Sequence, residues 1–287
     1  MPVGTTEFVT NTTADVFIPE IWAAEAIVAR ENRLVFAPLM NLRYKKELMR
    51  LGDKVNIPNI SELAARTKTA VTAINYETIT ETNQTITVAT HEYSAMAVED
   101  ITRVQADRDL FAAYAGKLGY ALDLALDNVL AAFVDDSSTQ AVGTLGADLT
   151  YEDMLRARQF LDDADAPEEN RHIVVSPAQE AGLMKLDHFI HNDYKAMQAI
   201  TTGSGNRGHI GGWLGMPIWK SVNTEGTNAT GHDNAMFHSD WVGLIVQFKP
   251  KMESMRDIDF LVDKVAAQQL HGSKVLRSDH GSWMRGA

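Results

Sequence analysis

The sequence contains no cysteine. This absence excludes disulfide bonds, thiolate catalysis and cysteine-ligated zinc or iron–sulfur sites. The stability of the folded chain must therefore come from packing and association. A chain that assembles in a reducing cytoplasm fits this composition.

Long hydrophobic runs are also absent. No stretch approaches the roughly 18 apolar residues that a membrane-spanning helix requires. Residues 1–13 are small and polar, without the basic flank and apolar run of a signal peptide. We therefore expect neither a signal peptide nor a membrane span.

Positive charge is scarce, with 26 Lys and Arg against 38 Asp and Glu and a net charge of -12. Proteins that grip nucleic-acid phosphates need clustered basic residues. The longest basic block is Arg43-Tyr44-Lys45-Lys46, which reads as a solvated turn or helix face. Specific nucleic-acid binding is disfavoured, whereas 45% hydrophobic and 22% charged residues are typical of a folded globular chain.

Three sequence patterns resemble phosphate-binding, hydrolase or zinc-binding motifs, but each lacks a feature that the motif requires. The glycine-rich run 203–208 lacks the Gly-Lys-Ser/Thr ending of a phosphate-binding loop. His238-Ser239-Asp240 has the residue types of a hydrolase triad, but triad members are rarely sequence neighbours. His188 and His191 could share a helix face, yet no zinc-ligand pattern surrounds them. We expect no catalytic, cofactor or metal site.

The section 52–98 is rich in threonine and mostly polar, which favours extended chain. A long ribbon with so little apolar surface is stable only when it lies on another surface. Glu81-Thr82-Asn83-Gln84, between two isoleucines, is interpreted as the tip of a hairpin. Such a ribbon is unusual in an enzyme and expected in an interlocking subunit.

The section 103–134 has apolar residues at every third or fourth position, which predicts one long amphipathic helix. Asp123 and Asp127 occupy its other, polar face. Upstream, Pro38 favours an extended conformation for residues 34–39.

Further elements follow in the second half of the chain. Thr150 is a good helix N-cap, and Asp153 completes a capping box. Residues 172–175 predict a short buried strand, and Ser176-Pro177 starts another helix. Residues 223–234 read as a polar loop, and residues 241–248 as a strongly apolar strand.

The order of these parts resembles the tailed-phage major capsid protein family with the Hong Kong 97-type fold. The resemblance covers nearly the whole chain and depends on order and spacing rather than on any single motif. The segments that carry it are Ile18-Pro19-Glu20-Ile21-Trp22, Ala95-Met96-Ala97-Val98-Glu99-Asp100-Ile101, Tyr120-Ala121-Leu122-Asp123, His172-Ile173-Val174-Val175-Ser176-Pro177, Gly208 to Ile218, and Leu270-His271-Gly272-Ser273-Lys274-Val275-Leu276.

The resemblance implies an α+β fold with five parts. These are an N-terminal arm and first helix (1–51), an extended β-ribbon loop (52–98), a spine helix of the peripheral domain (99–136), an axial domain (137–247), and return strands of the peripheral domain (248–287). The ribbon would lie across a neighbouring subunit. Inter-subunit contacts are expected at Thr80, Thr82, Asn83, Gln84, Thr85, Phe17 and Trp22.

The resemblance also implies a structural rather than enzymatic role. Hexamers and pentamers would build an icosahedral shell, located in the virion and assembled in the host cytoplasm, that encloses a double-stranded DNA genome without specific DNA binding. The short arm before Phe17 implies a separate scaffolding protein, with a portal as a further partner. Some members cross-link through lysine, and Lys54 and Lys68 lie in the right region, but nothing marks either.

Two alternatives stay open. An encapsulin-like compartment shares the fold but encloses a cargo enzyme, and the sequence does not separate the two. A soluble metal-dependent hydrolase that uses His188 and His191 is the alternative from a different class of protein.

Overall fold

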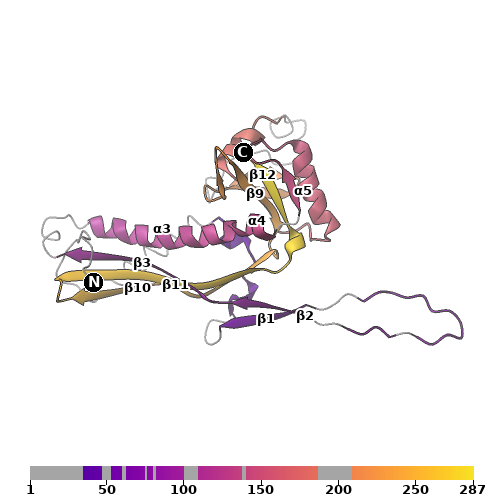
Figure 1. Cartoon of the computed structure of the whole chain (residues 1–287), viewed down its shortest axis with the longest axis horizontal. Helices are drawn as coiled ribbons and strands as arrows, with labels where there is room; N and C mark the ends of the chain where they lie inside the picture. Colours follow the sequence, from indigo (N-terminus) through magenta and orange to yellow (C-terminus); the bar gives the residue numbers. More distant parts are fainter. Residues whose placement is uncertain are drawn as a thin grey trace.

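The computed structural model describes residues 35–46, 53–59, 63–74, 76–79, 82–99, 109–137, 140–186 and 209–287. A long narrow sheet with one helix along it forms the base of the molecule (Figure 1). A second, mixed lobe stands over one end of this sheet, and a thin loop projects beyond strands β1 and β2 (Figure 1). Phe17, Trp22, Thr80, His188 and His191 lie outside the described residues.

The long sheet has three antiparallel strands in the order β10–β11–β3. The strands are β3 (Thr90–Glu99), β10 (Val242–Asp257) and β11 (Val262–Val275). Helix α3 (Asp109–Ala131) packs on one face, where Leu118 and Leu122 contact Met252 and Val265. At 1.5 Å per residue this helix is about 35 Å long. It confirms the expected long helix over its described part, and a short helix α4 (Phe133–Ser137) follows it.

The second lobe contains a seven-stranded sheet in the order β4–β12–β9–β5–β7–β6, with β8 paired to β9. The β4–β12 and β5–β7 pairs are parallel, and the other pairs are antiparallel. Its strands are β4 (Ala141–Gly143), β5 (Arg171–Val175), β6 (His209–Trp213), β7 (Met216–Lys220), β8 (Gly226–Thr227), β9 (Gly231–His238) and β12 (Gly281–Gly286).

Helices cover both faces of the seven-stranded sheet. Helix α5 (Tyr151–Asp163) and its neighbour α6 (Pro177–Leu183) bury one core, in which Met154 and Leu161 meet Ile173. On the other face, the C-terminal half of α3 and the segment around Phe36 pack against Phe237. Because side chains alternate along a strand, neighbouring β5 residues face opposite cores.

The end of the chain divides between the two sheets. The return strands expected over residues 248–287 include most of β10 and all of β11, but β12 pairs with β9 and β4 in the seven-stranded sheet. A 3-10 helix, η4 (Ser278–His280), makes the crossing. Among the described helices, none is long and apolar enough to cross a membrane.

The local capping predictions are confirmed. Thr150 Oγ1 accepts a hydrogen bond from Asp153 N (3.2 Å), and Asp153 Oδ2 accepts one from Thr150 N (3.0 Å). Ser176 Oγ caps α6 by accepting from Gln179 N at 2.9 Å, with Pro177 in the first turn. Each cap satisfies main-chain donors that lack partners inside the helix.

Two local predictions are wrong. Residues 34–39 were expected to be extended, but Ala37–Leu39 forms a 3-10 helix, η1, closed by a hydrogen bond from Leu39 N to Phe36 O (3.0 Å). Pro38 is tolerated there because the first turn of a helix needs no N–H donor from that position. A second short helix, η2 (Arg43–Lys46), follows.

The loop expected over residues 223–234 ends earlier, because the buried strand β9 begins at Gly231. Its polar side chains are accommodated by specific partners. Asn234 Oδ1 accepts from Ser176 N at 2.6 Å, and Asp233 Oδ1 accepts from Trp283 Nε1 at 2.7 Å. Buried polar groups are tolerated when they are hydrogen-bonded in this way.

The polar face expected on the long helix is not solvated. Asp123 and Asp127 are both buried. Asp127 Oδ1 accepts from Phe36 N (2.9 Å), and its Oδ2 accepts from Asn223 Nδ2 (2.7 Å). Burial raises the pKa of Asp127, while these hydrogen bonds act in the opposite direction. Helical periodicity located this face correctly but could not show that distant segments cover it.

Candidate assembly surface

The ribbon expected in the first third of the chain begins as a two-stranded antiparallel hairpin. Strand β1 (Lys54–Asn59) pairs with β2 (Thr82–Thr87) along its full length, from Lys54 opposite Thr87 to Asn59 opposite Thr82. This hairpin differs from the one expected, because its connection consists of residues 60–81 rather than the tetrad 81–84.

The base of the hairpin is tightly anchored on the long sheet. Val55, Ile86 and Val88 are buried together with Ile245 of β10. Val88 N donates to Asp53 O at 2.8 Å, and the strand backbone passes directly over Gly272 of β11. A side chain at that glycine would collide with Thr87 O, so the close approach depends on the missing Cβ.

Beyond the base, the described parts of the connection project away from both sheets (Figure 1). In the described part of the connection, the two arms are linked where the Glu77 carboxylate accepts from Arg66 Nη2 (2.6 Å) and Ala64 N (3.1 Å). A turn at Thr69–Thr72, with Thr72 Oγ1 donating to Thr69 O at 2.7 Å, reverses the chain.

The projecting connection exposes large apolar side chains. Tyr76 has 87% of its surface exposed, and Val71, at the turn, is fully exposed. Among the described residues of the connection, these side chains are Leu63, Val71, Ile74, Tyr76 and Ile79, which we call the loop apolar set. Val71 also has φ +70°, a region that a β-branched residue rarely adopts. Both the exposed side chain and the backbone conformation of Val71 are therefore costly for an isolated turn.

The residues 82–85, which the sequence suggested as contacts near a hairpin tip, lie instead at the base of the ribbon. Thr82, Asn83, Gln84 and Thr85 lie in β2, paired with β1, so the interpretation of 81–84 as a hairpin tip is wrong. Thr85 Oγ1 donates to Asn56 Oδ1 across the pair at 2.7 Å. A sequence signal for the projecting part was present: the loop apolar set consists of single large apolar residues spaced among polar residues and alanines in the section 63–79.

A second exposed apolar group lies at the opposite end of the molecule, where β10 turns into β11. Met255, Ile258, Phe260 and Leu261 each expose more than half of their surface there. The charges around them are paired within the hairpin, since Lys264 Nζ lies 2.5 Å from Asp257 Oδ2 and Arg256 Nη1 lies 3.3 Å from Asp263 Oδ1. The hairpin end therefore presents apolar surface with two of its three carboxylates paired, and Asp259 leaves it one negative charge in excess.

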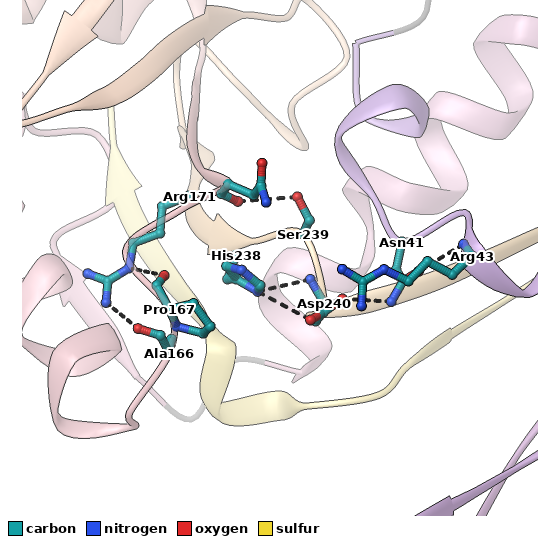
Figure 2. Close-up of polar contacts among 9 residues, drawn as sticks. Asn41, Arg43, Ala166, Pro167, Arg171, His238, Ser239 and Asp240 are labelled. Atoms are coloured by element: carbon teal, nitrogen blue, oxygen red, sulfur yellow. Dashed lines mark hydrogen bonds and ion pairs between the residues drawn. The ribbon is translucent and has the colours of Figure 1, made fainter.

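His238-Ser239-Asp240 is not arranged as a triad. Asp240 N donates to His238 Nδ1 at 3.1 Å, whereas Ser239 Oγ donates to Asn170 O at 3.2 Å (Figure 2). A nucleophilic serine would need its hydroxyl on the histidine ring. These residues instead form part of a polar network at the junction of the two sheets.

One group of acidic side chains in the described part of the chain is close enough to share a cation. Asp135, Glu225 and Asp233 place carboxylate oxygens within 4.8 Å of one another. Burial raises the pKa of Asp233, and the hydrogen bond from Trp283 opposes this shift. Such surface clusters are common without an ion, and this arrangement alone does not define a metal site.

The architecture matches solved capsid structures over almost its whole length. A structure from Mycobacterium phage Che8 is 21% identical, with a TM-score of 0.74, and the match covers 100% of this chain and 97% of that one. The capsid of cyanophage P-SCSP1u is 15% identical, with a TM-score of 0.69, covering 99% and 93%. A virus-like particle from Pyrococcus furiosus is 11% identical, with a TM-score of 0.61, covering 94% and 100%. A comparison with curated proteins found no match.

The long helix on a narrow sheet, the separate mixed lobe and the projecting ribbon together define a subunit of the Hong Kong 97-type capsid fold. The family model described as phage capsid protein matches residues 44–276, and the chain belongs to that family. It is accordingly a major capsid protein, a structural component of a phage shell built from many copies.

Proposed function

We propose that the subunits form hexamers and pentamers of an icosahedral shell that encloses double-stranded DNA. In this proposal the connection between β1 and β2 lies across a neighbouring subunit, where the loop apolar set becomes buried. The observation that carries the proposal is this exposed apolar group on a projecting loop, because a monomer gains nothing from holding these side chains in water.

The proposal divides the contacts into two kinds. Thr82, Asn83, Gln84 and Thr85 would contribute through the outer edge of β2, since their backbone partners on the inner side are already in β1. The hairpin end at Met255 and Phe260 would meet further copies. Thr80, Phe17 and Trp22 stay in the proposal as contacts suggested by the sequence.

The remaining parts of the proposal concern assembly. A separate scaffolding protein would direct closure, a portal would occupy one vertex, and assembly would take place in the host cytoplasm. We assign residues 137–247 to the axial domain around the local symmetry axes, joined there by β12. The role is structural rather than catalytic, because the shell family and the dispersed His238-Ser239-Asp240 geometry both favour it.

Negative-stain electron microscopy of the purified chain, alone and with its candidate scaffolding partner, tests the shell. Closed particles or polyheads are expected, and a homogeneous small oligomer under both conditions would contradict the proposal. The likeness to the virus-like particle keeps a cargo compartment as the second candidate. Nuclease-resistant DNA in particles isolated from infected cells supports the phage shell, whereas a co-purifying cargo enzyme without DNA supports the compartment.

A further inference from the structure

The two sheets are joined at a buried junction, beside the core that contains Trp241 and Val242. Residues 239–241 lead from β9 into β10, and residues 276–280 lead from β11 back to β12. The two connections are tied together by Trp241 O, which accepts from Leu276 N (2.8 Å) and Arg277 N (3.2 Å). The segment 35–46 crosses beside them, with Asn41 N donating to Val242 O at 3.0 Å. Any change in the angle between the sheets must alter these contacts.

His238 stands at the centre of this junction. It is the last residue of β9 and is 4% exposed. Its Nδ1 accepts from Asp240 N at 3.1 Å, and Asp240 Oδ1 accepts from Asn41 Nδ2 at 2.7 Å, so a short chain of hydrogen bonds links the end of β9 to the segment 35–46 (Figure 2). An accepting Nδ1 requires the neutral tautomer of the ring, with its proton on Nε2. Protonation of Nδ1 would place its N–H against the main-chain N–H of Asp240, so two donors would face each other with no acceptor between them.

A second buried histidine faces the first. His280, in η4, is 3% exposed, and its ring stands edge-on to that of His238 with centroids 5.7 Å apart. Its Nδ1 is buried and makes no hydrogen bond. Two imidazolium rings at this separation would repel each other in a site that water reaches poorly.

The surrounding charges do not compensate for two added protons. Among the described residues, His238 interacts with the cations Arg171 and Arg43 and with the anion Asp240, whose Oδ2 lies 3.9 Å from Nδ1. His280 interacts with the anions Asp279 and Asp240, with the cation Arg277 and with His238 itself. His172, on β5, adds a third imidazole to the same field.

Burial is the largest cause in each case, and it lowers the pKa of His238 and of His280 below the ordinary value. Burial also lowers the pKa of His172 to about 4. An opened junction would restore ordinary histidine values, so the open form binds more protons. The closed junction is therefore fully favoured above about pH 6.5 and loses this advantage as the pH falls toward the lowered values.

We propose that this junction is an acid-sensitive latch, in which protonation of His238 and His280 releases residues 238–241 from Asn41 and from the 276–280 connection. The two sheets then move relative to each other. This movement repacks the core that Phe237 shares with Trp241, Val242 and Leu244, while the core under α5 stays intact. This inference concerns the subunit itself and goes beyond the shell-building function.

Hydrogen–deuterium exchange of the full-length protein at about pH 7.5 and about pH 5, with labelling times scaled to the intrinsic rates, tests the latch. Peptides that cover 238–246 and 274–282 should lose roughly tenfold in protection at the lower pH. Peptides from α5 should not, because α5 packs in the separate core around Met154. Equal loss in all peptides would mean global acid unfolding and would overturn the proposal, as would unchanged protection at the junction.

Two variants with opposite effects sharpen the test. His238→Asn keeps an acceptor for Asp240 N but cannot take up a proton, and it should reduce the acid response severalfold. Asp240→Asn keeps the acceptor for Asn41 but removes the anion that favours protonated His238 in the closed form, so the response should increase. His91→Asn, at an exposed position on β3, is the matched control and should leave the response unchanged. Changes in the same direction in all three variants would contradict the latch, and the Asp240→Asn result stands even if His238→Asn fails to fold.

Discussion

The main-chain N–H of Phe36 donates to Asp127 Oδ1 across 2.9 Å, although 91 residues separate the two in the sequence. This bond fixes the N-terminal segment against the long helix at the level where the two sheets meet. The same carboxylate holds Asn223 from the second lobe. One buried side chain thus ties together three parts of the subunit.

Replacement of Asp127 by alanine should lower the free energy of unfolding by about 2–4 kcal/mol, because it leaves the buried N–H of Phe36 and the part-buried amide of Asn223 without their acceptor. Urea unfolding of the dissociated subunit measures this. Asp148→Ala is the control, since Asp148 pairs with Lys185 on the surface and its loss should cost less than about 1 kcal/mol. Equal effects of the two variants would show that the Asp127 contacts contribute little.

Val71→Gly separates the role of the tip side chain from that of the turn. Glycine adopts φ +70° without strain, so the subunit should be as stable as the wild type or slightly more stable. If the side chain is buried in a neighbour, assembly should instead require about tenfold more protein, because a buried valine contributes about 1.5 kcal/mol or more. Light scattering against subunit concentration measures the threshold, and an unchanged threshold would remove Val71 from the interface.

Removal of residues 69–72 should leave the subunit folded and block shell formation. Removal of residues 82–84 should act differently, because it deletes half of the strand pairing between β2 and β1 and loosens the anchored base. Thermal unfolding and electron microscopy of both deletions distinguish the two effects. Normal shells from the 69–72 deletion would show that the loop end is not an assembly element.

Gly272→Ala should detach the base of the ribbon. The added Cβ would collide with Thr87 O, a backbone atom that cannot move without shifting β2, and the expected loss is about 1–3 kcal/mol. Gly212→Ala is the matched control, because a Cβ there meets only Met216 O at an ordinary 3.6 Å. Faster proteolysis within residues 60–81 in the first variant alone is the expected result; equal rates would argue against the close approach.

Arg171→Lys should destabilise the second lobe despite the conserved charge. The buried guanidinium donates through Nε to Pro167 O at 2.8 Å, through Nη1 to Asp162 Oδ1 at 2.5 Å, and through Nη2 to Ala166 O. A lysine ammonium has a single nitrogen and cannot bind all three acceptors at once. The free energy of unfolding should therefore fall by about 2 kcal/mol, measured by thermal or urea unfolding. Arg158→Lys, with looser pairs at 3.7 Å, should change little.

Several elements could be predicted from the sequence because their causes are local. The capping box of Thr150 and Asp153, the start of α6 at Ser176-Pro177 and the buried strand after residue 170 depend on neighbours within a few positions. The long helix followed from its periodicity. The surplus of acidic residues and the lack of cysteine also limited the function before any contact was known.

Other features depended on residues far apart in the chain. Helical spacing placed Asp127 on a polar face, but only tertiary structure brought Phe36 and Asn223 to it. Threonine content indicated a ribbon, but not the position of its tip. The tip lies at 69–72 rather than 81–84 because β2 pairs with β1, which is more than twenty residues away in the sequence.

The amino-acid sequence by itself determined the composition of the elements, their order and the family resemblance, because these depend on local propensity and spacing. Tertiary structure decided which carboxylates are buried, which apolar side chains stay in water, where the ribbon is anchored and how His238 and His280 come to face each other. Those outcomes are set by packing between distant segments, and burial and the electrostatic environment of a side chain exist only once that packing has formed.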